Sequence, residues 1–285
     1  MTLGLLAKSM PYREQGFFCN DVEIYNPFRP DTIPAASMSK LYNLIYAIII
    51  PATEFLFIKF IWAKRFPAER DFSFFATLIT NTIFFVIIML SGDLLLDVTA
   101  NIAKRTISRL RPNYMDVCKP ANLDVLCPYG SQYYVSNYTC TGLSDPDLHY
   151  AFPSGHSAHS AYFAVVMIFY LQARFIKTSP IKFFLQFFTA TLAIFVCLTR
   201  VRDFKHRLSD VAGGVMLGTL FGLAVIFFVL ENFKSTKKIF LPDNNKQSST
   251  NNEVRKVTFD CTIGGDTHCM PFKKSVPTYG CSEQV

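Results

Sequence analysis

The chain has 285 residues, of which 51% are hydrophobic and only 17% charged, and its formal net charge is +7. A soluble domain of this size normally carries about a quarter of charged residues. The apolar residues come in long blocks rather than with strand or amphipathic-helix periodicity, which excludes a disordered, collagen-like or disulfide-scaffold protein. We therefore predict an integral membrane protein whose basic excess faces lipid headgroups or phosphates, with no nucleic-acid partner.

Five apolar blocks are long enough to cross a hydrocarbon core of about 30 Å as helices. Open loops and sheet edges cannot face lipid, so the expected fold class is all-α, a polytopic membrane helix bundle. Pro51 predicts a kink in the first block, where Glu54 should face protein or water, more as an interhelical contact than as a catalytic group. The five expected transmembrane helices cover residues 41–62, 73–96, 157–171, 181–198 and 211–230.

The chain divides into three expected parts. Residues 1–40 contain no secretory signal and should form an exoplasmic N-terminal segment. Residues 41–232 should form the membrane-embedded core, with its functional loops on the exoplasmic side. Residues 233–285 are polar and are expected to be a disordered cytosolic tail.

The orientation in the membrane rests on glycosylation and cysteines, because Lys and Arg are about equally frequent on both sides. The only sequon, Asn137-Tyr138-Thr139, lies in the long loop between the second and third blocks, so Asn137 is a candidate glycosylation site. Four cysteines on the same side could form two disulfides, which suits an oxidising compartment. They are Cys19, Cys118, Cys127 and Cys140.

Three short segments at the mouths of adjacent helices on that face carry candidate functional residues. These residues are Lys104, Arg111, Ser154, Gly155, His156, Arg200, His206 and Asp210. Taken singly, each has a simpler explanation: a Lys at a membrane face usually snorkels, and Pro-Ser-Gly usually forms an ordinary turn. His149 and His159 are interpreted as interfacial polar residues. The neighbouring cations are expected to form a solvated basic rim, namely Arg105, Arg109, Arg202, Lys205 and Arg207.

Together these residue types favour phosphoryl transfer. The phosphoryl group spreads negative charge over three equatorial oxygens, which Arg forks and a Lys ammonium stabilise, and a Ser-Gly turn that opens a helix offers backbone N–H groups. Two His residues can supply a nucleophile and a proton donor near neutral pH. His206 and Asp210 are four residues apart, so on a helix the carboxylate could hold the imidazole. No acidic cluster has metal-ligand spacing, so we expect no metal.

The spacing of these segments resembles a known signature. Lys104–Pro112 reads K-x6-R-P, Pro153–His156 reads P-S-G-H and Arg200–Asp210 reads R-x5-H-x3-D. Together they resemble the three motifs of the type-2 phosphatidic acid phosphatase superfamily, and most of all the animal lipid phosphate phosphatases. The segments Gly16–Asp21 and Ile49–Thr53 are also similar to that family, so the resemblance covers about residues 11–232.

The resemblance implies a phosphatidate phosphatase that needs neither metal nor cofactor. In such an enzyme His206 attacks the phosphate to form a phosphohistidine, Asp210 supports it, and His156 protonates the leaving lipid alkoxide. The implied substrates are phosphatidate, lysophosphatidate, sphingosine 1-phosphate and ceramide 1-phosphate. The implied location is the plasma membrane with the site facing the exterior or a lumen, and a homo-oligomer is compatible with it. The residues expected to hold the phosphate oxygens are Lys104, Arg111, Ser154, Gly155 and Arg200.

Two departures from the family pattern leave alternatives open. Thr199 stands where the third motif usually has Ser, which keeps the hydroxyl. Family members have six spans, and the one before Phe17 is missing here, so we expect a shortened isoform or an N-terminus that inserts as a reversed anchor. The main alternative function is a weakly active isoform that binds lipid phosphates or regulates partners. Glucose-6-phosphatase and the sphingosine-phosphate-specific phosphatases share the core motifs, and a transporter is least favoured because the ionisable residues lie at a membrane mouth.

Overall fold

The computed structural model describes residues 15–62, 74–143, 145–175 and 179–230, together with Ser9 and Pro11. The chain divides into two units, Met1–Leu241 and Pro242–Val285, and all described residues belong to the first. The tail predicted to be disordered, residues 233–285, therefore lies outside the described residues.

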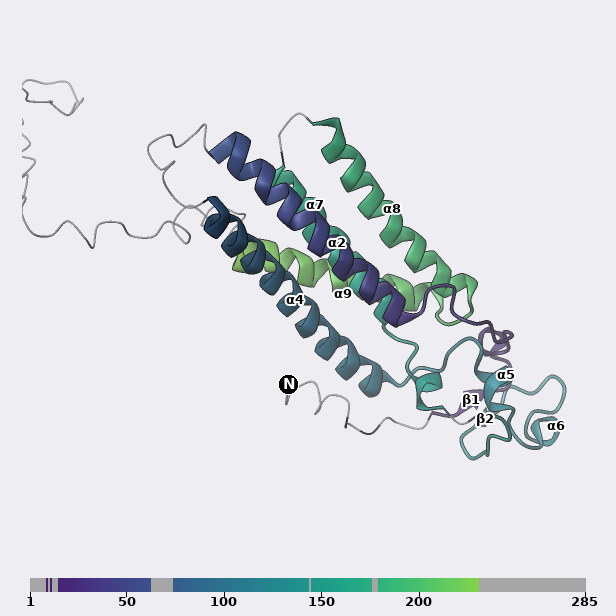
Figure 1. Ribbon diagram of the computed structural model, residues 1–285. Coiled ribbons are helices and arrows are strands. Elements are labelled where there is room, and N and C mark those ends of the chain that lie inside the picture. The colour runs from purple at the N-terminus through teal and green to yellow at the C-terminus, as the bar shows by residue number, and fades with distance from the viewer. Residues whose placement is uncertain are drawn as a thin grey trace, which may run out of the picture. The chain divides into compact units, whose positions relative to one another are not determined.

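Long helices dominate the first unit, which confirms the all-α class (Figure 1). The helix α4 (Phe74–Ile107) runs well past the predicted end at Leu96, because neither Gly nor Pro interrupts the sequence between Leu96 and Pro112. The helices α2 (Ala35–Leu56) and α9 (Leu208–Ala224) end in π-helical turns, η2 (Phe57–Trp62) and η5 (Val225–Val229). The long helices are α2 (Ala35–Leu56), α4 (Phe74–Ile107), α7 (Gly155–Arg174), α8 (Pro180–Arg202) and α9 (Leu208–Ala224).

Four helical segments in the described part of the chain are long and apolar enough to span a membrane. They are Ala35–Phe60, Phe74–Ile107, Pro180–Arg202 and Leu208–Val229. The third predicted span corresponds to α7, which is too rich in Ser, His and Tyr to meet the same criterion. Most side chains of α7 are buried, and this helix contacts each of the other four. A helix enclosed by other helices needs no continuous apolar surface, which explains why α7 carries so many polar groups.

The helices α7 and α9 pack with their backbones in contact. Gly214 and Gly218 lie one turn apart on α9, and a Cβ atom on either would collide with a backbone carbonyl oxygen of the α7 segment, that of Ser154 or Ala158. Small residues at this spacing let two membrane helices approach closely. This contact places the first turn of α9 beside the start of α7, where the Ser154 N–H donates to the Asp210 carbonyl oxygen at 3.0 Å.

Glu54 joins three helices through its buried carboxylate. Arg174 of α7 donates to it from Nε at 2.9 Å and from Nη2 at 3.0 Å. The Tyr170 hydroxyl, also on α7, and the Asn81 amide of α4 donate to the same carboxylate at 3.0 Å each. The carboxylate is thus fully paired inside the helices, which confirms the predicted interhelical contact.

Short elements gather at one end of the long helices, as Figure 1 shows, and form what we call the disulfide cap (residues 16–25, 108–143 and 145–150). Disulfides Cys19–Cys127 and Cys118–Cys140 join the four cysteines predicted to pair. A small apolar cluster that includes Phe17 and Tyr114 fills the interior of the cap, and Asn137 is exposed on it. The elements are β1 (Phe17–Phe18), η1 (Val22–Ile24), α5 (Tyr114–Cys118), α6 (Leu123–Leu126), β2 (Tyr134–Val135) and η4 (Pro146–His149), with β1 antiparallel to β2.

Candidate active site

The structure places the predicted site residues at the ends of the long helices that face the disulfide cap. Lys104 lies in the last turn of α4, and Arg200 in the last turn of α8. Ser154 is the N-cap residue of α7, and its hydroxyl accepts from the Ser157 N–H. The remaining predicted residues lie in loops or first turns at the same ends: Arg111, Gly155, His156, His206 and Asp210.

His206 lies in the loop between α8 and α9 and is 4% exposed. Its Nδ1 atom lies 2.7 Å from the Ala151 carbonyl oxygen, which can only accept a hydrogen bond. Nδ1 therefore carries the proton, and in the neutral ring the lone pair is on Nε2. Burial holds the pKa of His206 well below its usual value, and the positive charges of Arg111 and Lys104 lower it further. The ring is neutral at pH 7 and has a nucleophilic nitrogen.

The direct contact expected between Asp210 and His206 is replaced by other pairings. Oδ1 of Asp210 accepts from Arg109 at 2.8 Å, and Oδ2 accepts from the backbone N–H of Arg207 at 2.8 Å. His206 and Asp210 were expected to lie one turn apart on the same helix. This expectation fails because α9 begins only at Leu208, so His206 precedes the helix. The Ala151 carbonyl therefore orients the imidazole, while Asp210 fixes the start of α9.

Arg200 and His156 meet the segment that precedes α2. The guanidinium of Arg200 is 1% exposed and pairs with Asp31 at 2.9 Å and with Asp203 at 3.1 Å. His156 Nε2 lies 3.1 Å from the Ile33 carbonyl oxygen, which only accepts, and 3.4 Å from Nη1 of Arg200, which only donates. We assign the proton to Nε2 from the shorter contact, which leaves Nδ1 unprotonated in the neutral ring. A proton on Nε2 is the one that His156 could deliver to a leaving oxygen.

Arg111 and Lys104 approach the same region from α4 and the chain after it. Arg111 donates from Nε to the Asp147 carbonyl oxygen at 2.8 Å and pairs through Nη2 with the carboxylate of the same residue at 2.6 Å. The ammonium of Lys104 lies over Gly155, where a Cβ atom would be only 3.0 Å from Nζ. Gly155 therefore leaves room for Lys104 beside the backbone N–H groups that open α7.

Residues 26–34, which we call the N-terminal strap, cross the site from the cap to the loop after α8. The Phe28 N–H donates to Asp116 of the cap at 2.8 Å, and Arg29 donates to the Arg202 carbonyl oxygen at 3.2 Å. The N–H and hydroxyl of Thr32 both donate to the Asp203 carboxylate at 2.7 Å. Burial alone would raise the pKa of Asp203, but these two hydrogen bonds and the Arg200 charge hold it below its usual value.

Several cations expected in a solvated rim are paired within the protein instead. Arg109 holds Asp210, and Arg207 pairs with Asp21 at 3.0 Å and with Glu23 at 2.5 Å. The Lys205 ammonium lies 4.2 Å from the centre of the Phe28 ring. Sequence reasoning missed these acidic partners, together with Asp31 and Asp147, because no spacing relates them to the motifs.

The arrangement can bind a tetrahedral anion. Arg200 and Arg111 each hold a carboxylate where a phosphate oxygen could bind, and Lys104 and the start of α7 add further donors. A positive charge on His156 would lower the pKa of His206 further, which is consistent with the two rings sharing one site. Among the described residues, no group of three or more His, Cys, Asp or Glu could hold a metal ion. The chemistry that fits these groups is nucleophilic displacement at phosphorus with a proton donor beside it.

Comparison with known proteins identifies the family. The model of the PAP2 superfamily matches residues 81–234. The chain is 32% identical over 242 residues to phospholipid phosphatase 1 of Rattus norvegicus, with 82% of this chain and 81% of the relative covered. It is 30% identical over 229 residues to phospholipid phosphatase 2 of Homo sapiens, with 79% and 76% covered. No solved structure matches the chain. The chain therefore belongs to the PAP2 superfamily, which confirms the family and the phosphatase class predicted from its three motifs.

Proposed function

We propose that the protein hydrolyses lipid phosphate monoesters through a phosphohistidine on His206. The observation that carries this proposal is the buried, neutral imidazole whose Nδ1–H bonds the Ala151 carbonyl and whose Nε2 holds the lone pair. The names of the related phospholipid phosphatases support a phosphorylated lipid as substrate. The substrates proposed are phosphatidate, lysophosphatidate, sphingosine 1-phosphate and ceramide 1-phosphate.

Binding would begin with an exchange of anions. The substrate phosphate displaces the Asp31 carboxylate from Arg200 and the Asp147 carboxylate from Arg111, and charge-assisted hydrogen bonds of the same kind form with its oxygens. Lys104 and the backbone N–H groups at the start of α7 stabilise the charge that develops on the equatorial oxygens.

The chemistry then takes two displacement steps. In the free site, burial and the Arg200 charge lower the pKa of His156 to about 4, so its ring gains a second proton only when the bound phosphate dianion supplies negative charge beside it. Nε2 of His206 attacks phosphorus, the P–N bond forms as the P–O bond to the lipid breaks, and the doubly protonated His156 gives its Nε2 proton to the leaving alkoxide and becomes neutral. In the second step His156 takes a proton from water, the water oxygen attacks phosphorus, and the P–N bond breaks. The Ala151 carbonyl stabilises Nδ1–H throughout, because the ring is cationic while it carries the phosphoryl group. No metal enters either step.

The proposal is tested by phosphate release from phosphatidate in detergent micelles that contain EDTA. We expect the wild type to release phosphate and His206→Ala to release none, because the variant lacks the nucleophile. Asn137→Gln, which changes an exposed side chain of the cap, serves as the control and should retain turnover. Turnover by His206→Ala at the wild-type rate would contradict the proposed nucleophile. Binding of phosphatidate by a well-folded wild type without release would favour the lipid-phosphate-binding alternative.

We also propose that the site faces the exterior or a lumen, at the plasma membrane. Two disulfides and the exposed sequon at Asn137 lie on the cap beside the site, and both features suit an oxidising compartment. The same assay tests this orientation when a water-soluble short-chain phosphatidate is added outside intact cells. Release without permeabilisation supports the exoplasmic site, and release only after permeabilisation contradicts it.

A further inference from the structure

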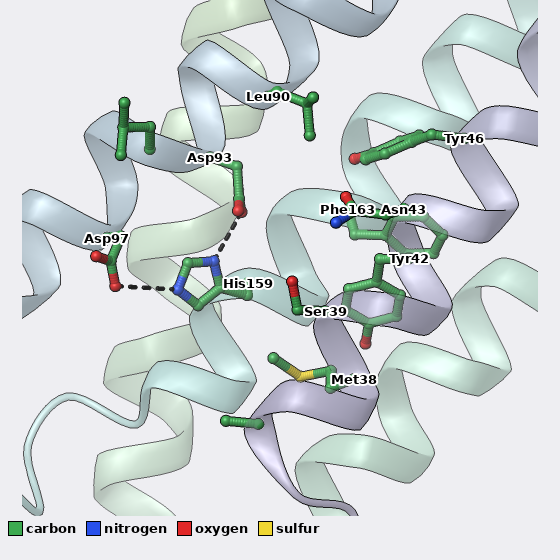
Figure 2. Close-up of a pocket in the computed structure, with 12 residues that line it drawn as sticks. Met38, Ser39, Tyr42, Asn43, Tyr46, Leu90, Asp93, Asp97, His159 and Phe163 are labelled. Carbon is green, nitrogen blue, oxygen red and sulfur yellow. Dashed lines mark hydrogen bonds and ion pairs between the residues drawn. The ribbon is translucent and has the colours of Figure 1, made fainter. Parts of the chain in front are cut away.

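A second polar cluster lies one to two helical turns away from the phosphate site, inside the helices. His159 of α7 bridges two carboxylates of α4: Nδ1 lies 2.7 Å from Asp93, and Nε2 lies 3.6 Å from Asp97 (Figure 2). A pocket of about 420 Å³ opens beside this trio, between α2, α4 and α7. The sequence predicted only an ordinary interfacial residue at His159, so its two acidic partners are a finding of the structure.

The pocket has an excess of negative charge. Even with a charged imidazolium, one His and two carboxylates leave one net negative charge, and none of the described residues that line the pocket is Lys or Arg. The side chains of Asp93 and Asp97 are 38% and 42% exposed, so both carboxylates remain accessible from the pocket. The second carboxylate oxygen of Asp93 accepts no hydrogen bond from the described residues. The cluster can therefore accept a further cationic donor.

The side chains on the wall of the pocket opposite the carboxylates are suited to binding an organic cation. Tyr46 is only 4% exposed, lines the pocket and points its hydroxyl into it (Figure 2), and this hydroxyl has no hydrogen-bond partner among the described residues. The rings of Tyr42 and Phe163 stack beside it with their centroids 4.2 Å apart. Carboxylates and aromatic faces together are the groups that bind alkylammonium ions, and a buried hydroxyl can accept one of the ammonium hydrogens.

The pocket and the phosphate site are built on the same three segments. On α4, Asp97 precedes Lys104 by seven residues, so it lies on the same face about 10 Å further into the bundle. On α7, His159 follows His156 by three residues, about 4.5 Å further along the axis. Ile33, which accepts from His156, leads directly into α2, whose Ala35 lines the pocket. The pocket thus lies deeper among the helices than His156, in the direction that the hydrocarbon chain of a bound lipid would take into the membrane.

We propose that this pocket binds the ammonium group of lipid phosphates that carry a primary amine close to the phosphate ester, as sphingoid base phosphates do. In these lipids the nitrogen is three bonds from the ester oxygen that His156 would protonate. Asp93 and Asp97, held apart by His159, select the amine and take no part in the bond changes. The inference rests on the proposed function and adds a specificity subsite to it.

The test compares two substrates that differ only in the charge and acylation of the nitrogen, sphingosine 1-phosphate and N-acetylsphingosine 1-phosphate. With the full chain in mixed micelles, kcat/KM should favour the free amine by about tenfold, as expected for one charge-assisted hydrogen-bonded contact. In Asp93→Asn/Asp97→Asn this ratio should fall to about one, because both carboxylates are replaced by neutral amides of the same shape. Asp124→Asn makes the same change of side chain at an exposed position of the cap. It serves as the control and should keep the wild-type ratio.

The outcomes separate this subsite from the proposed function. Absence of phosphate release from both substrates would refute the proposed function itself. Release from both substrates with the same ratio in the wild type and the double variant would refute the subsite and leave the phosphatase standing. An equal loss of turnover on both substrates in the double variant would assign the trio a structural role and also overturn the subsite.

A measurement on the wild type alone covers the case of a double variant that does not fold. Sphingosine, which has the amine and no phosphate, should inhibit hydrolysis of lysophosphatidate at about tenfold lower concentration than N-acetylsphingosine. Equal inhibition by the two compounds would refute the subsite.

Discussion

The helix core and the disulfide cap place their parts of the phosphate site by different means. In the core, Gly218 allows α9 to lie with its backbone against α7, and helix packing positions Ser154 and His206. In the cap the elements are only a few residues long, and two disulfides hold them together. Arg111 and its partner Asp147 belong to this second region. The proposed nucleophile, His206, thus depends on close packing, whereas part of the proposed anion-binding set depends on covalent cross-links.

The two regions contribute different things: the core supplies proposed reacting groups, and the strap and the cap supply carboxylates that compete with phosphate for the arginines. Core helices supply His156 and Arg200. The strap and the cap supply Asp31 and Asp147, the carboxylates that phosphate would displace from Arg200 and Arg111, while Asp203 after α8 also pairs with Arg200. Changes in the core should therefore abolish turnover together with folding, while changes in the cap and strap should alter how tightly anions bind.

The largest effect is expected from Gly218→Val. A side chain at this position collides with the Ala158 backbone, which cannot move aside as a flexible side chain could, so α9 cannot stay against α7. We expect loss of the folded protein and of all turnover, measured by size-exclusion chromatography and phosphate release in detergent. Met216 of the same helix is 67% exposed, so the Met216→Val control should fold normally. A folded, active Gly218→Val protein would contradict the close contact.

An intermediate effect is expected from Cys118→Ser/Cys140→Ser. This disulfide closes a loop with a sequence separation of 22, for which the chain-entropy model gives about 3 kcal/mol of stabilisation. Amide hydrogen exchange should become faster in residues 108–143 while α7 and α9 stay protected, because the helix packing and the buried hydrogen bonds of the core do not depend on this disulfide. Cys197→Ser, which removes a buried thiol outside any disulfide, should leave exchange in the cap unchanged. Equal loss of protection in α7 would show that cap and core unfold as one unit.

The smallest effect is expected from Asp31→Asn. The variant removes the carboxylate that competes with phosphate for Arg200, so KM should fall by about two- to tenfold with little change in kcat. Asp116→Asn weakens the strap at Phe28 without changing the partner of Arg200, and it controls for loosening of the strap. A KM that falls equally in both variants would attribute the effect to strap mobility rather than to competition between anions.

The sequence motifs selected residues that the structure brings to the same end of the helix bundle, because each motif is short and lies at a helix end. Ser154, Gly155 and His156 are adjacent, and the helix that they open follows from the apolar block behind them. The contact between His206 and Asp210 was predicted wrongly because it needed the first residue of α9, which the apolar pattern does not define.

The rest of the site depends on contacts between distant residues. Arg200 and Asp31 are 169 positions apart, and His159 and Asp93 are 66 apart, with no periodicity that relates them. The same limit applies to α7, whose polar residues are explained only by the four helices that contact it. Such pairings depend on how the helices pack, and a single sequence carries little information about that.

The ion pair between Glu54 and Arg174 has a consequence for how the protein is made. The two residues are 120 positions apart, so the ribosome synthesises α2 with its carboxylate long before α7 exists. An unpaired carboxylate at that depth opposes insertion into lipid, and the cost disappears once the guanidinium and Tyr170 arrive. During biogenesis α2 would therefore reach its final position only after α7 has been made, and the buried pair would link the order of synthesis to the order of assembly.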